Sequence, residues 1–219
     1  KKIFNNDNLN ILYAPCFEND NKGIEVVKSV KNLKINLLVK HLPWSQPFER
    51  SKHKDIRQNI FKMINYLRNN FKGQYKIVNS HSNIFDIFNQ ANILITDESS
   101  VIYESLLFNI PVISCDDWLM RSSNKNPPRF VKKNDDICIY TKKSELKKKL
   151  LEIIQNYSEF QDKVKNKKNN YFSYIENSVD NIYEIINEIV VSKNVMYCEK
   201  PKYKVNYFKS FYKNLSFNL

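Results

Sequence analysis

Short apolar runs alternate along this chain with longer segments in which apolar residues recur every three or four positions. The runs cover 10–17, 35–39, 75–78, 92–96, 112–114 and 137–140. Helical spacing covers 23–33, 51–71, 84–89, 101–108 and 144–157, with one or two further helices over 158–192. Strands that alternate with helices pair in parallel, so we predict an α/β, Rossmann-like parallel sheet with helices on both faces and extra C-terminal helices.

A polar segment, TDESS, follows the fourth apolar run and precedes a helix. Asp97, Ser99 and Ser100 therefore lie at the carboxyl end of a predicted strand, which is where open α/β sheets bind ligands. Each of the three is either a helix cap or a ligand contact, and a cap needs only one of them. We predict that this turn grips an anion.

Two other strands are also followed by polar residues. Lys40 and His41 come directly after the second run and place a positive charge and a ring donor at the same edge of the sheet. His81 lies in the loop after the third run, where Ser82 or Asn83 is a natural cap for the next helix. We expect both loops to neighbour the TDESS turn, with Lys40 and His41 facing it.

TDESS, followed by Glu104 and then by Pro111 and Val112, resembles the TDYSS segment of CDP-glycerol glycerophosphotransferases, the enzymes that build teichoic-acid-type polymers. More loosely, it resembles the donor-nucleotide half of GT-B glycosyltransferases. The resemblance implies that Ser99 and Ser100 hold the donor's phosphates and that Glu104 holds its ribose. The sequence departs from the family at Glu98, where Tyr is usual, and at Glu104, where the nearest relatives often have Asp.

The same resemblance gives expectations for the histidines. His41, with Lys40, would contact the donor phosphate or help the leaving group depart, which makes His41 the catalytic candidate. His81 would lie near the base or ribose. The donor is expected to be a CDP- or UDP-linked substrate, with no separate cofactor and no metal, and the acceptor a saccharide or polyol phosphate.

The chain has 219 residues, enough for one core and a small appendage. We expect a nucleotide-binding domain over 1–192 and an aromatic, lysine-rich tail over 193–219. Because a GT-B enzyme has two such domains and this chain begins at Lys1 without an initiator Met, we expect an upstream half that carries the general base.

The amino-acid composition narrows the classes of protein to which this chain can belong. The chain has a net charge of +12, but only five of its 35 basic residues are Arg, so nucleic-acid binding is not expected, whereas an anionic membrane or polymer fits. Only two Gly occur, which excludes a Gly-rich dinucleotide fingerprint and a P-loop. The four Cys lack CxxC spacing and are expected to be thiols of a cytosolic protein. Adjacent carboxylates at Asp116 and Asp117 point apart in extended chain, so they are read as a solvated turn.

The sequence thus predicts the donor-binding domain of a GT-B-type transferase in bacterial cell-surface polysaccharide, capsule or teichoic-acid-like polymer synthesis. It is expected in the cytoplasm, with peripheral contact to the inner face of the membrane through the tail. Two alternatives stay open: a sugar-nucleotide epimerase of the same architecture, and a non-catalytic, membrane-associated binding module.

Overall fold

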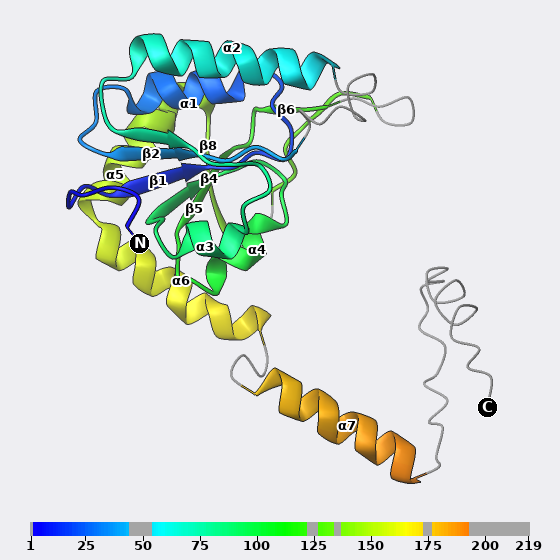
Figure 1. Ribbon diagram of the computed structural model, residues 1–219. Helices are drawn as coiled ribbons and strands as arrows, with labels where there is room; N and C mark the ends of the chain where they lie inside the picture. Colours follow the sequence, from blue (N-terminus) through cyan, green and yellow to red (C-terminus); the bar gives the residue numbers. More distant parts are fainter. Residues whose placement is uncertain (1, 44–53, 122–126, 134–136, 173–176, 193–219) are drawn as a thin grey trace. The chain divides into compact units, whose positions relative to one another are not determined.

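A computed structural model describes residues 2–43, 54–121, 127–133, 137–172 and 177–192. Six parallel strands form one sheet in the order β3-β2-β1-β4-β5-β8 (Figure 1). The strands are β1 (Asn10–Tyr13), β2 (Asn36–Val39), β3 (Tyr75–Ile77), β4 (Ile93–Ile95), β5 (Val112–Cys115) and β8 (Cys138–Thr141). The predicted α/β parallel sheet is confirmed, and each apolar run contains or overlaps one of its strands.

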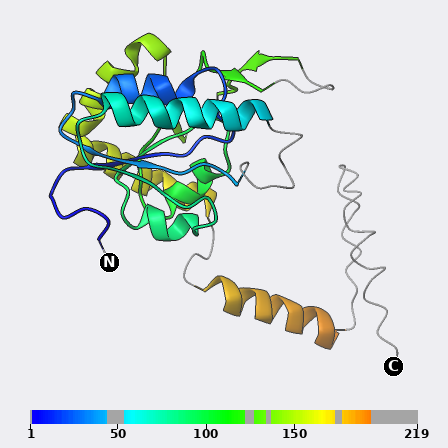
Figure 2. The same ribbon diagram turned by 45° about the horizontal axis from the view of Figure 1, so that its top comes forward.

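Helices cover both faces of this sheet, as the sequence predicts. On one face lie α1 (Lys22–Val30), α2 (Lys54–Asn70) and α5 (Leu146–Gln155), which pack against the side chains of β1 and β2 that point to that face. On the other lie α3 (Ile84–Phe88), α4 (Val101–Leu106) and α6 (Tyr157–Tyr171). Figures 1 and 2 show α1 and α2 side by side. Alternate residues of β1 feed the two cores, since Ile11 belongs to one and Leu12 to the other.

The order of the strands determines where a ligand can lie. From β1 the chain moves outward through β2 and β3, then returns to pair β4 with the opposite edge of β1. Loops that leave β1 and β4 therefore turn to opposite faces and open a crevice at the carboxyl edge of the sheet. This is the topological switch point, and the TDESS segment begins beside it.

A second, two-stranded sheet was not expected from the sequence. It pairs β6 (Leu119–Met120) with β7 (Arg129–Phe130) in antiparallel fashion. Two-residue strands are too short to show an alternating pattern, so this segment reads as a polar loop in the sequence. We call residues 119–133 the ribbon segment, of which 122–126 lie outside the described residues.

The chain divides into two compact units, Lys1–Phe172 and Ser173–Leu219. Within the second, α7 (Ser178–Ser192) carries apolar side chains that are exposed, among them Val179, Ile182 and Ile186. The aromatic tail predicted over 193–219 lies outside the described residues. Among those that are described, no helix has the length and apolar character needed to span a bilayer.

Candidate functional site

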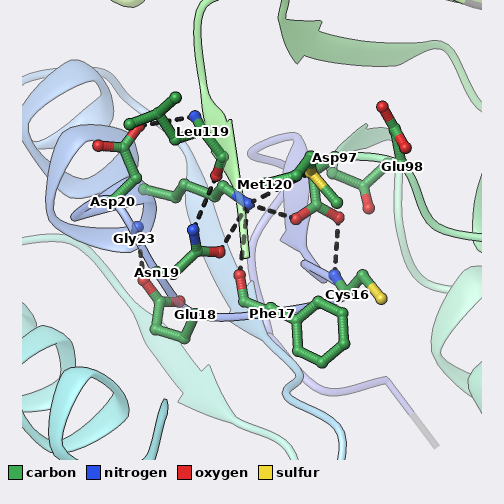
Figure 3. Close-up of polar contacts among 12 residues, drawn as sticks. Cys16, Phe17, Glu18, Asn19, Asp20, Gly23, Asp97, Glu98, Leu119 and Met120 are labelled. Atoms are coloured by element: carbon green, nitrogen blue, oxygen red, sulfur yellow. Dashed lines mark hydrogen bonds and ion pairs between the residues drawn. The ribbon is translucent and has the colours of Figure 1, made fainter. Parts of the chain in front are cut away.

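Two loops meet at the switch point: the loop after β1 (14–21) and the serine turn, residues 97–100 after β4. Asp97 joins them. It is fully buried, and its Oδ2 atom forms an ion pair with the Lys22 Nζ atom at 2.7 Å, while its Oδ1 atom accepts a hydrogen bond from the Cys16 N–H at 2.7 Å (Figure 3). Lys22, the first residue of α1, is also fully buried. Both carboxylate oxygens of Asp97 are thus engaged inside the chain.

This differs from the simplest expectation for Asp97. The sequence suggested a helix cap or a contact with the donor, whereas the carboxylate lies beneath the turn and fixes it to the β1 loop. A direct contact with a donor would require one of these buried bonds to break. Neither does Ser100 cap α4, because its side chain accepts no hydrogen bond from the backbone of that helix.

The β1 loop is held in an unusual conformation by its own polar residues. Asp20 and Asn21 both have positive φ, at 57° and 55°. The Asp20 carboxylate accepts from the Leu119 N–H at 2.8 Å and from the Lys143 ammonium at 2.6 Å, and the Asn19 amide donates to the Leu119 carbonyl (Figure 3). Left-handed backbone costs little for Asn and Asp, so the loop can turn sharply and still reach the ribbon segment.

Glu18 lies inside this loop and is 2% exposed. Its Oε1 atom accepts from the Gly23 N–H, and its Oε2 atom accepts from the Tyr13 hydroxyl, both at 2.9 Å. The His41 Nε2 atom lies 2.9 Å from the same Oε2 atom. A Cβ on Gly23 would lie 2.9 Å from the carboxylate and 2.4 Å from the Met63 Cγ atom, so only Gly lets α1 start this close to Glu18.

The serine turn borders a hollow of about 450 Å³. Its lining comes from the turn, from α4, from the ribbon segment and from β8: Glu98, Ser99, Ser100, Ile102, Tyr103, Lys132, Lys133 and Tyr140. Ser100 is exposed, and its hydroxyl lies 3.4 Å from the Glu104 carboxylate one turn into α4. The structure therefore brings Ser99, Ser100 and Glu104 together, and adds two lysines that the sequence reasoning did not single out.

Lys40 and His41 lie elsewhere on the same edge. Both are nearly buried, at 8% and 7% exposure. The Lys40 ammonium donates to the Ser80 carbonyl at 2.9 Å, and burial lowers its pKa. His41 lines a different hollow, of about 310 Å³, between α2 and the ends of β2 and β3. The expectation that Lys40 and His41 face the serine turn from a neighbouring strand was wrong, because β1 lies between β2 and β4.

The strand register sets the distance between the serine turn and the segment that carries Lys40 and His41. Tyr13 of β1 pairs with Val39 of β2 on one side and with Ile95 of β4 on the other. The chain after β2 and the chain after β4 therefore leave the sheet at the same height, two strand spacings or about 10 Å apart. His81 is farther away, in the exposed loop after β3, which is three strands from β4. Asn83 caps α3 through its side chain, as predicted.

Glu98, where this chain departs from the family's TDYSS, is the anchor of the ribbon segment. Its Oε1 and Oε2 atoms accept from the Arg129 guanidinium at 2.5 and 2.6 Å, and Oε1 also accepts from the Lys132 N–H. Hydrogen bonding from Arg129 holds the pKa of Glu98 below its usual value, against the opposing effect of partial burial. The pair sets Lys132 and Lys133 beside the serine turn.

The Arg129→Gln variant is expected to raise the pKa of Glu98 toward the ordinary value of about 4.3. Because the pKa of Glu98 is depressed in the folded chain, this pair contributes stability above the ordinary pKa that is lost as the pH falls through the folded value. The variant should therefore have a lower free energy of unfolding at neutral pH, and this free energy should fall less steeply as the pH is lowered. NMR titration of the Glu98 carboxyl group measures its pKa. The control variant Arg121→Gln, which breaks the pair with Asp55 instead, should leave the pKa of Glu98 unchanged.

The remaining candidates are engaged in the fold. Asp116 pairs with Lys133 and Lys142, and Asp117 accepts from the Lys143 N–H. Among the described residues, no three His, Cys, Asp or Glu side chains are placed to hold a metal ion. Cys115 and Cys138 are buried free thiols. Burial raises the pKa of the Cys16 thiol to about 11. Cys198 lies outside the described residues.

Sequence reasoning missed Glu18 and Lys22, which lie between the predicted strand over 10–17 and the predicted helix over 23–33. A signal was present for Lys22, because it shares the helical face of Val26 and Val30 at four-residue spacing, a face that is otherwise apolar. For Glu18 no local pattern exists, since its partners Tyr13 and His41 come from β1 and from the segment after β2.

Comparison with solved structures shows which known folds this chain resembles. The structure is similar to a putative UDP-N-acetylglucosamine 2-epimerase from Listeria monocytogenes, with a TM-score of 0.53 and 16% identity over 86% of this chain and 47% of that protein. It is also similar to the wall teichoic acid polymerase TagF, with a TM-score of 0.50 and 18% identity over 87% of this chain and 45% of the polymerase. A TagF variant soaked with CDPG gives the same TM-score. The chain thus spans less than half the length of these proteins, and at such identities the likeness shows the fold alone.

No curated protein matches this chain significantly. The family described as CDP-Glycerol:Poly(glycerophosphate) glycerophosphotransferase matches residues 3–188, which is most of the chain. The resemblance seen in the TDESS segment and the expected Rossmann-like domain of GT-B type are both confirmed. The chain therefore belongs to the CDP-glycerol:poly(glycerophosphate) glycerophosphotransferase family.

Proposed function

We propose that this chain is the donor-binding domain of a glycerophosphotransferase and that the donor's diphosphate lies across the switch point, from the serine turn toward His41. The observation that carries the proposal is the position of the serine turn, at the carboxyl end of β4 where the strand order reverses, in a chain of this family. The gap of about 10 Å between the ends of β2 and β4 suits an extended diphosphate ester better than a single phosphate.

In this proposal the residues have separate tasks. Ser99 and Ser100 donate hydroxyl hydrogen bonds to phosphate oxygens, and Lys132 and Lys133 supply positive charge at the border of the same hollow. Glu104 accepts from the ribose hydroxyls, while Asp97 holds the turn from below. Positive charge aimed at the leaving nucleotide stabilises the charge that develops as the acceptor hydroxyl attacks.

The proposed reaction also needs a general base for the acceptor hydroxyl. The described carboxylates of the serine turn are already engaged, Asp97 with Lys22 and Glu98 with Arg129. Glu104 is assigned to the ribose, so none of the three is left to act as that base. We therefore propose that a second domain supplies the base and binds the acceptor, a polyol phosphate or saccharide. The likeness to an epimerase concerns the fold alone and gives no separate support to the epimerase alternative.

The test is calorimetric titration of the full chain with CDP, UDP and GDP. We expect saturable binding of CDP, and Ser100→Ala should weaken it about tenfold, since a hydrogen bond to a charged group contributes about 1.5 kcal/mol or more. Ser29→Ala is the matched control, because the Ser29 hydroxyl donates to the Glu25 carbonyl of its own helix. Absence of binding by all three nucleotides, or an unchanged affinity of Ser100→Ala with full binding by the control, contradicts the proposal.

A further inference from the structure

His41 does not stand alone at the end of β2; it shares a buried carboxylate with two other donors. The Glu18 Oε2 atom is 2.9 Å from both the Tyr13 hydroxyl and the His41 Nε2 atom, and Oε1 accepts from the Gly23 N–H. The rings of Tyr13 and His41 meet edge to face, with centroids 6.1 Å apart. Carboxylate, phenol and imidazole thus form one cluster with little exposure to water.

The hydrogen bonds indicate which imidazole nitrogen carries a proton. Burial, and next the negative charge of Glu18, raise the pKa of the Tyr13 phenol well above its ordinary value, so this hydroxyl keeps its proton and donates it to Oε2. An ionised carboxylate only accepts hydrogen bonds. The nitrogen that faces it, His41 Nε2, must therefore be the donor, which leaves Nδ1 as the nitrogen that can meet a ligand.

We propose that Glu18 is a positioning residue for His41: it holds the imidazole by its Nε2–H, presents Nδ1 to the donor's diphosphate, and makes binding of that anion take up one proton. The proposal rests on the proposed function. In the neutral ring Nδ1 has a lone pair and repels a phosphate oxygen, so a hydrogen bond forms only after Nδ1 gains a proton from solvent. The Nε2 proton stays on its nitrogen, and the buried carboxylate stabilises the resulting imidazolium.

The charged groups around His41 indicate that Glu18 is the residue that would stabilise a protonated imidazole. Arg57 of α2 borders the same hollow. Lys40, which precedes His41 in the chain, donates from its ammonium to the Ser80 carbonyl of the loop after β3. Tyr13 of β1 is neutral. Neither cation can stabilise a positive charge on the imidazole, whereas the Glu18 carboxylate contacts the ring directly. Removing its charge should therefore remove the proton uptake.

The first measurement concerns the tautomer and needs no nucleotide. Nitrogen-15 NMR of the full chain at pH 8, where an ordinary imidazole is neutral, is expected to show His41 protonated at Nε2 and bare at Nδ1. In Glu18→Ala the preference should be lost, and the spectrum should move toward a mixture of the two tautomers. A wild-type His41 protonated at Nδ1, or an Nε2–H signal unchanged in Glu18→Ala, overturns the proposal.

The second measurement concerns proton uptake. Titration with CDP at pH 8 in two buffers of different ionisation enthalpy gives the number of protons bound with the nucleotide. We expect net uptake by the wild type, little or none in Glu18→Gln and His41→Asn, and a weakening of about tenfold in Glu18→Gln, the difference between a charged and a neutral hydrogen-bond partner. Glu18→Gln preserves the size of the buried side chain, so it keeps the test open where the alanine variant fails to fold.

The matched control is Asp20→Asn, a charge removed from the same loop at a carboxylate that bonds Leu119 and Lys143 instead of His41. It should keep the wild-type uptake. Equal uptake in the wild type and Glu18→Gln overturns the positioning role while leaving nucleotide binding intact. If CDP, UDP and GDP all fail to bind the wild type, the proposed function falls, and the tautomer measurement alone decides whether Glu18 sets the ring.

Discussion

Asp97→Ala is expected to lower the free energy of unfolding by about 3–5 kcal/mol, because it leaves the Lys22 ammonium buried without its anion. The Lys22 Nζ atom would keep neutral acceptors, the Asn19 side chain at 3.0 Å and the Phe17 carbonyl at 3.5 Å, but neither neutralises the charge. The Cys16 N–H would lose its acceptor as well. Urea denaturation measures this loss of stability as a shift of the midpoint concentration of urea, provided that the slope of the free energy against urea concentration stays the same.

A second pair of variants tests whether the effect comes from the unpaired charge. Asp97→Asn with Lys22→Met removes both charges and keeps an amide oxygen for the Cys16 N–H, so it should recover most of the stability. Arg121→Gln, which breaks an exposed pair with Asp55, should cost less than about 1 kcal/mol. A double variant as unstable as Asp97→Ala would show that the turn, and not the charge, is what fails.

The fold of the first unit could be predicted because hydrophobic spacing is a local property. Each strand of the sheet and each helix face is encoded by residues close in sequence, and the side-chain cap at Asn83 also follows from nearby residues. The strand order is not local. Apolar runs do not say that β4 returns to pair with β1, so His41 was assigned to a strand next to the serine turn when β1 lies between them.

The site was less predictable for the same reason. Asp97 and Lys22 are 75 positions apart, and neither has a pattern that names the other. A polar residue after a strand looks the same in sequence whether it points into the crevice, as Ser100 does, or beneath it, as Asp97 does. Asp97 differs from Ser100 in having a buried partner of opposite charge, Lys22, and this partner is known only once the loops are placed in three dimensions.

Trp118 shows how the ribbon segment is tied to this arrangement. It directly follows Asp116 and Asp117, which were predicted to form a solvated turn, yet its side chain is fully buried in the core that includes residues of α1 and α5. Its carbonyl accepts from the Val131 N–H, and the next residue, Leu119, bonds Asn19 and Asp20 of the β1 loop. The indole therefore fixes the backbone that orders both the loop and the ribbon segment.

Trp118→Ala is expected to cost about 3–5 kcal/mol, the usual result of removing a large aromatic from a packed core. Trp118→Phe should cost much less, because within the described residues the indole N–H has no hydrogen-bond partner and its loss breaks no bond there. Urea denaturation compares the two. If Trp118 also orders the β1 loop, Trp118→Ala should weaken CDP binding under native conditions while Trp118→Phe does not. Equal losses of stability in both variants would mean that the indole N–H is bonded and that its role in the core has been misjudged.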